Sequence, residues 1–297
     1  MENIQIYPAK VRVVPNVKLV KSITKFDAED YQELLGGEEG EVVEKRNHKK
    51  AGRIASPYKI TNADGYTGTS PLTEFDAAVL SACISEQKAD NDDTTPAVIL
   101  RALTGKVGEG GDHKMRTNQR RAILDSVEKL MCTKITADLS AVNEALGYHD
   151  GKKQKITSTI LPCDIITTTV NGQPVDDVIH FRGVSPILQI AEDRDQILRY
   201  DTALLDVPNQ NNTPLVIVLK NYCMRRVAEI KAHKMTPTLT FADIFKRARI
   251  SDASKHTKLD ARNVVENFFA HLKEKGAIKS FELVKRGNQI YAVKFIF

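Results

Sequence analysis

The 297-residue sequence has no long apolar run, and its first residues have no apolar core of the kind found in secretory signals. A membrane-spanning helix needs about 20 consecutive apolar residues, and a signal peptide needs an apolar core of roughly 7 to 15 residues. Because neither pattern is present, we expect a cytoplasmic protein that makes no membrane contact.

Cysteine is scarce, and the four cysteines (Cys83, Cys132, Cys163 and Cys223) form no C-x-x-C pair. Scattered cysteines of this kind are typical of small buried apolar residues in a reducing compartment. The seven histidines also lack the H-x-E and H-E-x-x-H spacings that hold zinc or non-haem iron. The sequence therefore predicts no metal site.

Patterns of catalytic and nucleotide sites are missing as well. The glycine-rich loop of residues 105–114 does not match G-x-x-x-x-G-K-[ST], because Gly111 is followed by Asp and His. The histidine-hydrophobic-histidine signature of rolling-circle nucleases is absent. The sequence also shows no candidate nucleophile accompanied by a candidate general base. The acidic pairs Asp92-Asp93 and Asp176-Asp177 are expected to be solvated turn residues. We predict a protein that is not an enzyme and needs no cofactor.

Positive charge is concentrated in residues 213–297. This segment has 17 Lys or Arg against 7 Asp or Glu, a net charge of +10, whereas the whole chain carries +5. Neutralisation of phosphates, with release of their counterions, supplies most of the non-specific affinity of proteins for DNA. The segment is therefore predicted to bind double-stranded DNA, and a solvated basic face is the alternative.

The order of predicted elements in residues 213–297 is that of a winged helix. Apolar residues recur at three- and four-residue steps from Pro214, which predicts a first helix. Thr240 begins a helix of about two turns, and a third helix over residues 255–275 stops at the following glycine. Two β-prone runs then flank the basic turn of residues 285–288. A basic hairpin after three helices is the wing.

Helix-turn-helix units place the second helix of the pair in the major groove, where its side chains reach base edges and phosphates. That role falls to the helix of residues 255–275, with the wing on the phosphate backbone. The candidate DNA contacts of this unit are Lys255, Lys258, Arg262, Asn263, Lys285 and Arg286. The apolar face of this helix is expected to pack in the core. The basic stripe of Lys255, Lys258 and Arg262 is expected to face outward. Protein-binding modules share this order of elements and are the alternative.

Residues 71–207 are predicted to contain a first winged helix. Thr73 caps its first helix, Thr95 begins a short second helix that Gly105 ends, and a third helix spans residues 116–132. Basic residues cluster where this third helix begins, at the place where it would meet DNA. They are Lys114, Arg116, Arg120 and Arg121.

Two observations favour weaker DNA contact by this first unit. Residues 73–135 carry a net charge of −1. In addition, Arg116 and Arg120 continue the line of Ile123 and Val127, so packing of their stems against the core is the alternative role.

Residues 136–212 are acidic, with a net charge of −5, and rich in strand signals. Strands are predicted over residues 155–161, 165–170, 175–181 and 197–207, the last with Asp201 interrupting it. The second and third are joined through Asn171-Gly172, a strong hairpin signal. The simplest architecture is an enlarged sheet attached to the first unit and suited to subunit contact, with residues 208–212 as a linker.

Residues 1–70 predict an N-terminal arm that is partly extended. Val11, Val13 and Val17 alternate like a strand, but residues 36–41 are glycine-rich and acidic, and residues 45–50 are basic. We interpret the segment as an extended or loosely packed arm. The basic cluster is expected to be a solvated loop, with DNA contact as the alternative. The predicted fold class is α+β: two winged-helix domains with a β-rich insertion between them.

This arrangement resembles the tandem winged-helix replication initiators (Rep-type proteins) of plasmids and mobile elements. The resemblance lies in TEFDAAVLSACISEQK and TTPAVILRALTG of the first unit, and in LKNYCMRRVAEIKAHK through HLKEKGAIKSFELVKRGNQIYAVKF of the second, about 225 residues. It implies initiation of replication at repeated origin sites, a switch between homodimer and monomer, and host replication proteins as partners. The N-terminal arm and the acidic first unit depart from that pattern.

Two other functions fit the same elements. A dimeric transcriptional regulator of a mobile element would bind a promoter palindrome, whereas an initiator would bind direct repeats beside an origin. A winged-helix adaptor would bind protein, and substitution of Lys258 and Arg262 would then leave DNA affinity unchanged.

Overall fold

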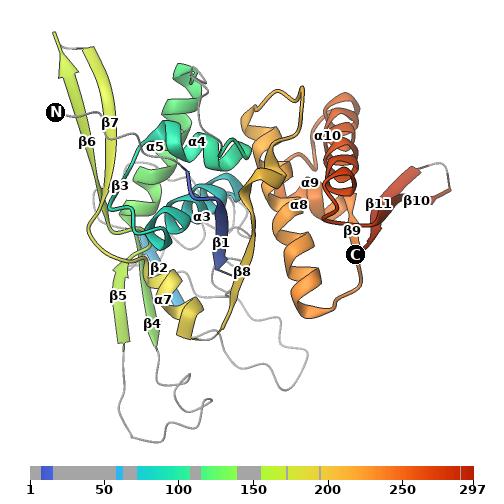
Figure 1. The fold of residues 1–297 in the computed structure, drawn as a ribbon, viewed down its shortest axis with the longest axis horizontal. Coiled ribbons are helices and arrows are strands. Elements are labelled where there is room, and N and C mark those ends of the chain that lie inside the picture. The colour runs from blue at the N-terminus through green and yellow to red at the C-terminus, as the bar shows by residue number, and fades with distance from the viewer. Residues whose placement is uncertain are drawn as a thin grey trace, which may run out of the picture.

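The computed structural model describes residues 8–15, 58–62, 72–107, 115–138, 155–171, 173–193, 195–287 and 289–297. Helices and antiparallel sheets are both present, which confirms the predicted α+β class. Figure 1 shows a first unit, in cyan, green and yellow, beside a C-terminal unit in orange and red. None of the helices in the described ranges is both long enough and apolar enough to cross a membrane.

The first unit contains α3 (Glu74–Lys88), β3 (Asp93–Thr94), α4 (Pro96–Thr104), α5 (Thr117–Cys132), β4 (Thr133–Asp138), β5 (Lys155–Thr159), β6 (Cys163–Val170), β7 (Gln173–Phe181) and α7 (Pro186–Asp193). The C-terminal unit contains α8 (Pro214–His233), β9 (Thr238–Thr240), α9 (Phe241–Arg247), α10 (Lys255–Glu274), β10 (Ser280–Arg286) and β11 (Gln289–Ile296). The remaining elements are β1 (Val11–Pro15), β2 (Tyr58–Asn62), β8 (Ile197–Asp201) and the 3-10 helix η1 (Thr202–Leu205).

Threonine residues begin most of these helices, as the sequence predicts. The Asp76 backbone N–H donates to the Thr73 hydroxyl at 3.2 Å, and the Thr73 backbone N–H donates to the Asp76 carboxylate at 2.7 Å. Thr95, Thr213 and Thr240 cap α4, α8 and α9 through their side chains. These caps satisfy N–H groups that have no partner within the helix.

The C-terminal unit is three helices covered by a small antiparallel sheet. Strand β9 lies between α8 and α9 in the chain, and it pairs with the second strand of the β10–β11 hairpin, so that the strand order is β10-β11-β9. The hairpin therefore closes back on the helices, and its free end projects to the right in Figure 1.

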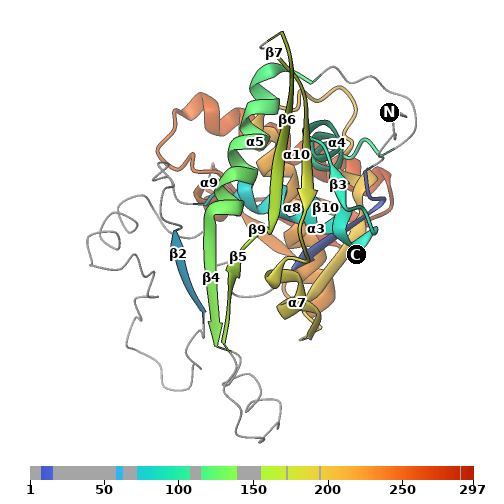
Figure 2. The same ribbon diagram turned by 90° about the vertical axis from the view of Figure 1, so that its left-hand side faces the viewer.

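The first unit repeats this connectivity with an insertion. Strand β3 lies between α3 and α4 and pairs with the second strand of the β6–β7 hairpin, which gives the order β6-β7-β3. The hairpin predicted through Asn171 is confirmed, and Asn171 has a left-handed φ of 53°. The insertion between α5 and β6 is the β4–β5 hairpin, to which β2 adds as a third strand (Figure 2).

Strand β1 lies between two hydrophobic cores and contributes to both. Val13 belongs to the core of the first unit, and Val14 belongs to the core of the C-terminal unit, because successive side chains of a strand point in opposite directions. Arg12 is buried as well, and its Nη2 donates to the Ala78 carbonyl at 2.6 Å. Residues Val11–Pro15 are therefore a packed strand paired with β8, where the sequence predicts a loose arm. The predictions for residues 36–41 and 45–50 lie outside the described residues.

The predicted strand over residues 197–207 is wrong in its second half. Strand β8 ends at Asp201, whose carboxylate accepts the Ala203 N–H at 2.9 Å and so caps η1. The predicted linker is also in contact with both units, because the Asn212 carbonyl accepts from Gln119 at 3.0 Å and the Asn212 side chain accepts from Lys220 at 3.0 Å.

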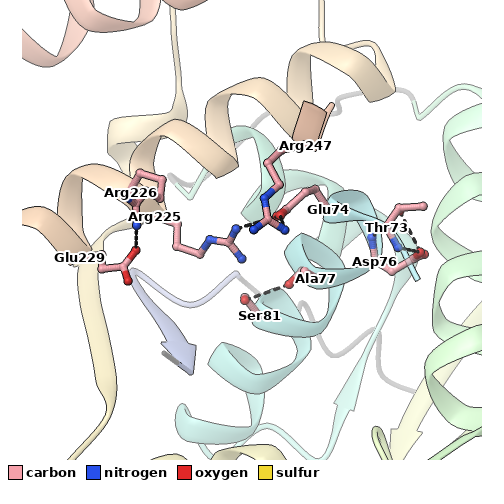
Figure 3. A network of polar contacts seen from close by, with 9 residues as sticks. All are labelled: Thr73, Glu74, Asp76, Ala77, Ser81, Arg225, Arg226, Glu229 and Arg247. Atoms are coloured by element: carbon pink, nitrogen blue, oxygen red, sulfur yellow. Dashed lines mark hydrogen bonds and ion pairs between the residues drawn. The ribbon is translucent and has the colours of Figure 1, made fainter. Parts of the chain in front are cut away.

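Helix α8 joins the two units. Ile217 packs in the core of the first unit, whereas Leu219 and Tyr222 pack in the other core. Figure 3 shows the polar side of this junction, where Arg225 of α8 and Arg247 of α9 both point at Glu74 of α3. The two units are therefore fixed to each other by apolar and charged contacts together.

Candidate nucleic-acid interface

Helix α10 has one apolar face and one polar face. Ser254 caps its first turn by accepting the Thr257 N–H at 3.1 Å. Its buried residues are Ala261, Val265, Phe268, Phe269, His271 and Leu272. The opposite side exposes Lys255, Leu259 and Asn263, which follow one another at four-residue steps. This spacing gives a continuous exposed strip along two turns of the helix.

The basic stripe predicted to face outward is divided between two environments. Lys255 is exposed and Lys258 is half-buried, whereas the guanidinium of Arg262 lies 5.7 Å from the ring centroids of both Phe241 and Phe245 on α9. The Nε of Arg262 is buried and has no hydrogen-bond partner among the described residues. Arg262 therefore packs in the angle between α9 and α10, where a cation–π contact stabilises it.

The β10–β11 hairpin presents its basic residues at the free end. Lys285 and Arg286 are both exposed, and a register shift separates Lys285 from Val284. The guanidinium of Arg286 lies 3.8 Å from the centroid of the Tyr291 ring, so its stem is held against the hairpin. Gly287 adopts the positive φ of 58° that the turn requires.

Part of the basic surplus of the C-terminal unit serves internal contacts. Among the described residues, six of its Lys and Arg side chains bind carboxylates or carbonyls within the protein: Lys220, Arg225, Arg226, Arg247, Arg249 and Lys294. The net charge of the segment therefore overstates the charge that α10 and the hairpin offer to a partner.

Three of the other predicted contacts, Arg116, Arg120 and Arg121, lie at the beginning of helix α5 of the first unit. Arg120 is the fourth residue of α5, as Lys258 is of α10. Its Nη2 and Nε both lie 2.6 Å from the Asp177 carboxylate on β7. Arg116 is exposed, and Arg121 is 84% exposed and lies 3.9 Å from Asp125.

The three described positions, Arg116, Arg120 and Arg121, are not equivalent. Arg120 ties α5 to the β6–β7 hairpin, while Arg116 and Arg121 are exposed. Lys114 lies outside the described residues. Asp177 is buried, with 2% of its side chain exposed, and also accepts from the Thr167 hydroxyl at 2.8 Å. The prediction of a solvated Asp176-Asp177 pair is therefore wrong for Asp177.

The four cysteines form no disulfide, and three of them are buried, as the sequence predicts: Cys83, Cys163 and Cys223. Burial raises the pKa of the Cys163 and Cys223 thiols to about 12, so both are protonated and unreactive at neutral pH. Within the described residues no three His, Cys, Asp or Glu side chains are grouped to hold a metal ion.

The charge pattern gives no sign of Leu259, the middle residue of the exposed strip. Leu259 is 50% exposed in the middle of the polar face of α10, between Lys255 and Asn263. The helical period indicates its exposure, because Leu259 does not fall at the three- and four-residue steps that join the buried positions Ala261 and Val265.

The described elements define an α+β protein in which a helix–helix–helix–hairpin connectivity occurs twice. No protein-family model matches the chain, and no curated protein sequence matches it. Among solved structures, selenomethionine derivatives of domains 2 and 3 of RctB are 12% identical, with a TM-score of 0.37 over 80% of this chain and 85% of that chain. A second structure of RctB domains 2 and 3 is 11% identical, with a TM-score of 0.38 over 81% of this chain and 86% of that chain. At such TM-scores the likeness carries no argument about fold or function.

Proposed function

We propose that the chain binds double-stranded DNA through its C-terminal unit, which acts as a winged helix with α10 in the major groove. The observation that carries this proposal is the exposed strip of Lys255, Leu259 and Asn263 on a helix whose other face is anchored in the core. A helix fits the major groove, and its outward side chains meet base edges and phosphates there.

The strip and its neighbours divide into two chemical roles. Asn263 can donate to and accept from an adenine edge, and Leu259 can contact a thymine methyl group, so these two residues read sequence. Lys255 and Lys258 bind backbone phosphates, and the hairpin residues Lys285 and Arg286 bind the phosphates beside the groove. Arg262 lies over Phe241 and Phe245. It supports α10 in this position and offers its outer N–H groups to a phosphate.

In this proposal the first unit is a second winged helix with a smaller share of the DNA affinity. Its helix α5 offers Arg116 and Arg121 to DNA, because both are exposed. Arg120 binds Asp177 inside the unit, so its charge is already neutralised. The chain that results is a non-enzymatic, sequence-specific DNA-binding protein without a cofactor.

The biological role that we propose is initiation of replication of a plasmid or other mobile element. Support comes from the resemblance of the two sequence units to tandem winged-helix initiators, and from the connectivity that the two units share. The same resemblance makes a homodimer and contact with host replication proteins part of this proposal.

Selection of bound duplexes from a random library tests the proposal. We expect the intact chain to enrich a defined sequence, and Asn263→Ala to lose preference at one adenine while retaining non-specific affinity. Leu259→Ala should weaken the preference at a neighbouring thymine. Enriched direct repeats support initiation, and an enriched palindrome supports the regulator. If no sequence is enriched and no duplex is retained, the adaptor function replaces this one.

A further inference from the structure

A cavity of about 370 Å³ lies between α4, the beginning of α5 and the residues that lead into α8. This volume is in the range of small-molecule sites, which is roughly 300 to 1,000 Å³. Its lining is mainly cationic and amide-bearing, in contrast to the apolar lining of most such sites. The residues with the relevant chemistry are Arg101, Lys106, Arg116, Asn118, Gln119 and Gln210.

Every charged residue among the described residues that line the cavity is a cation. Arg101, Lys106 and Arg116 line it, and no Asp or Glu is among its described lining residues. A fourth cation, Lys220, lies directly behind the wall, because its Nζ donates to the side chain of the lining residue Asn212 at 3.0 Å. Burial lowers the pKa of Lys220 to about 8, and the charge of Lys106 acts in the same direction, whereas Asp206 opposes it.

Two helices begin at the cavity, and their N-terminal ends add to its positive potential. Arg116 and Thr213, the N-cap residues of α5 and α8, both line it. Thr213 caps its own helix, but an arginine side chain has no acceptor and cannot cap α5. The first-turn N–H groups of α5 are therefore not capped by its own N-cap residue, and such groups bind phosphate readily.

The walls of the cavity are fixed, and one of them holds an unsatisfied polar atom. Gln119 of α5 donates from Nε2 to the Asn212 carbonyl at 3.0 Å, which joins α5 to the segment before α8. The Oε1 of Gln210 is buried and has no hydrogen-bond partner among the described residues.

We propose that this cavity is a phosphate-binding site, occupied either by a free phosphorylated small molecule or by a backbone phosphate of DNA. Arg101, Lys106 and Arg116 bind the phosphate oxygens, and the end of α5 adds backbone donors. The inference holds without the proposed DNA-binding role of α10, because none of the cavity residues belongs to that helix.

Isothermal titration calorimetry of the full chain with inorganic pyrophosphate, at low ionic strength and in a phosphate-free buffer, tests the site. Loss of a charge-assisted hydrogen bond weakens binding by roughly ten-fold or more, so Arg116→Gln should weaken pyrophosphate binding by that factor. Arg116→Glu should abolish it, since it places a negative charge in the cavity. Arg199→Gln removes the same charge from an exposed position on β8 that does not line the cavity. It should change the affinity by less than about two-fold.

A second arm measures the affinity of the same four proteins for a short random duplex. Pyrophosphate binding that falls only in the Arg116 variants identifies a free phosphorylated ligand. Duplex and pyrophosphate binding that fall together in those variants identify a DNA phosphate. A fall in duplex binding alone reports the surface contact already proposed for Arg116 and overturns the inference. The inference is overturned if both affinities are the same in the Arg116 and Arg199 variants, or if neither probe binds. Thermal melting followed by circular dichroism confirms that each variant is folded.

Discussion

The carboxylate of Glu74 on α3 accepts two hydrogen bonds from Nη2 of Arg225 on α8, at 3.0 and 2.8 Å. Arg247 of α9 lies 3.3 Å from the same carboxylate, of which only 4% is exposed. One buried carboxylate is thus shared by two guanidinium groups of the other unit (Figure 3). This residue contributes to the junction between the two units, because its loss removes the carboxylate that both cations contact.

Glu74→Gln is expected to lower the free energy of unfolding by about 3 to 5 kcal/mol, the usual cost of removing one partner from a buried ion pair. Urea unfolding at pH 7 measures the change. Glu192→Gln is the matched control, since Glu192 pairs with Lys88 at the surface and should cost about 1 kcal/mol or less. Equal effects of the two substitutions would show that the Glu74 contact does not hold the units together.

Gly105 ends α4 in the left-handed region, at a φ of 84°, with the backbone of η1 and Asp206 directly against it. A Cβ at this position would lie 2.2 Å from the Asp206 nitrogen, so backbone would have to move. We expect Gly105→Ala to destabilise the protein by about 3 kcal/mol or more. Gly276→Ala, at a φ of 70° but in open space, should cost only about 1 to 2 kcal/mol. A thermal-melting shift no larger for Gly105→Ala than for Gly276→Ala would contradict this account.

Arg120 and Arg121 are neighbours in α5 with different roles. Arg120→Gln leaves the buried Asp177 carboxylate without its cation, so we expect a loss of about 3 kcal/mol in unfolding free energy. Arg121→Gln removes an exposed charge and should change stability by less than about 0.5 kcal/mol. Chemical denaturation of both variants compares them, and a larger effect at Arg121 would reverse the assignment.

Lys220 makes stability depend on pH in the alkaline range. Below about pH 8 the Lys220 amine is protonated in both the folded and the unfolded protein, and burial of the charge opposes folding. Between about pH 8 and the ordinary pKa of 10.5, the amine loses its proton in the folded protein but keeps it in the unfolded protein. The unfolded state then binds more protons, so stability rises with pH. We compare the free energy of unfolding of the wild type with that of Lys220→Met. The wild-type value relative to the variant should increase by about 2 kcal/mol between pH 7.5 and 10. A difference that stays constant in urea titrations across this range would contradict the burial of a protonated amine.

Local features of the fold could be predicted from sequence because their causes are local. Thr73, Thr95, Thr213 and Thr240 each sit next to the amides that they cap, and Asn171 permits the tight turn of β6–β7. Helix α7 was not predicted, although Pro186 at its first position is a usual helix-start signal.

Features that depend on distant residues could not be predicted in this way. Strand β1 pairs with β8, about 190 residues further along the chain, and nothing near Val13 indicates that partner. The same holds for the candidate interface. The sequence shows Arg120 and Arg262 as cations in basic clusters, but their partners, Asp177 and the rings of α9, are set by tertiary packing.

DNA affinity measured by fluorescence anisotropy over a series of salt concentrations tests the central claim most directly. Each lost phosphate contact reduces the salt slope by about one. The intact chain should therefore bind duplex with a steep salt dependence that falls by about two in Lys255→Gln with Lys258→Gln. The double control Lys88→Gln with Arg199→Gln, which removes two charges from α3 and β8, outside the C-terminal unit, should keep the wild-type slope. Equal slopes in the two double variants, or no binding at low salt, would contradict DNA recognition by α10.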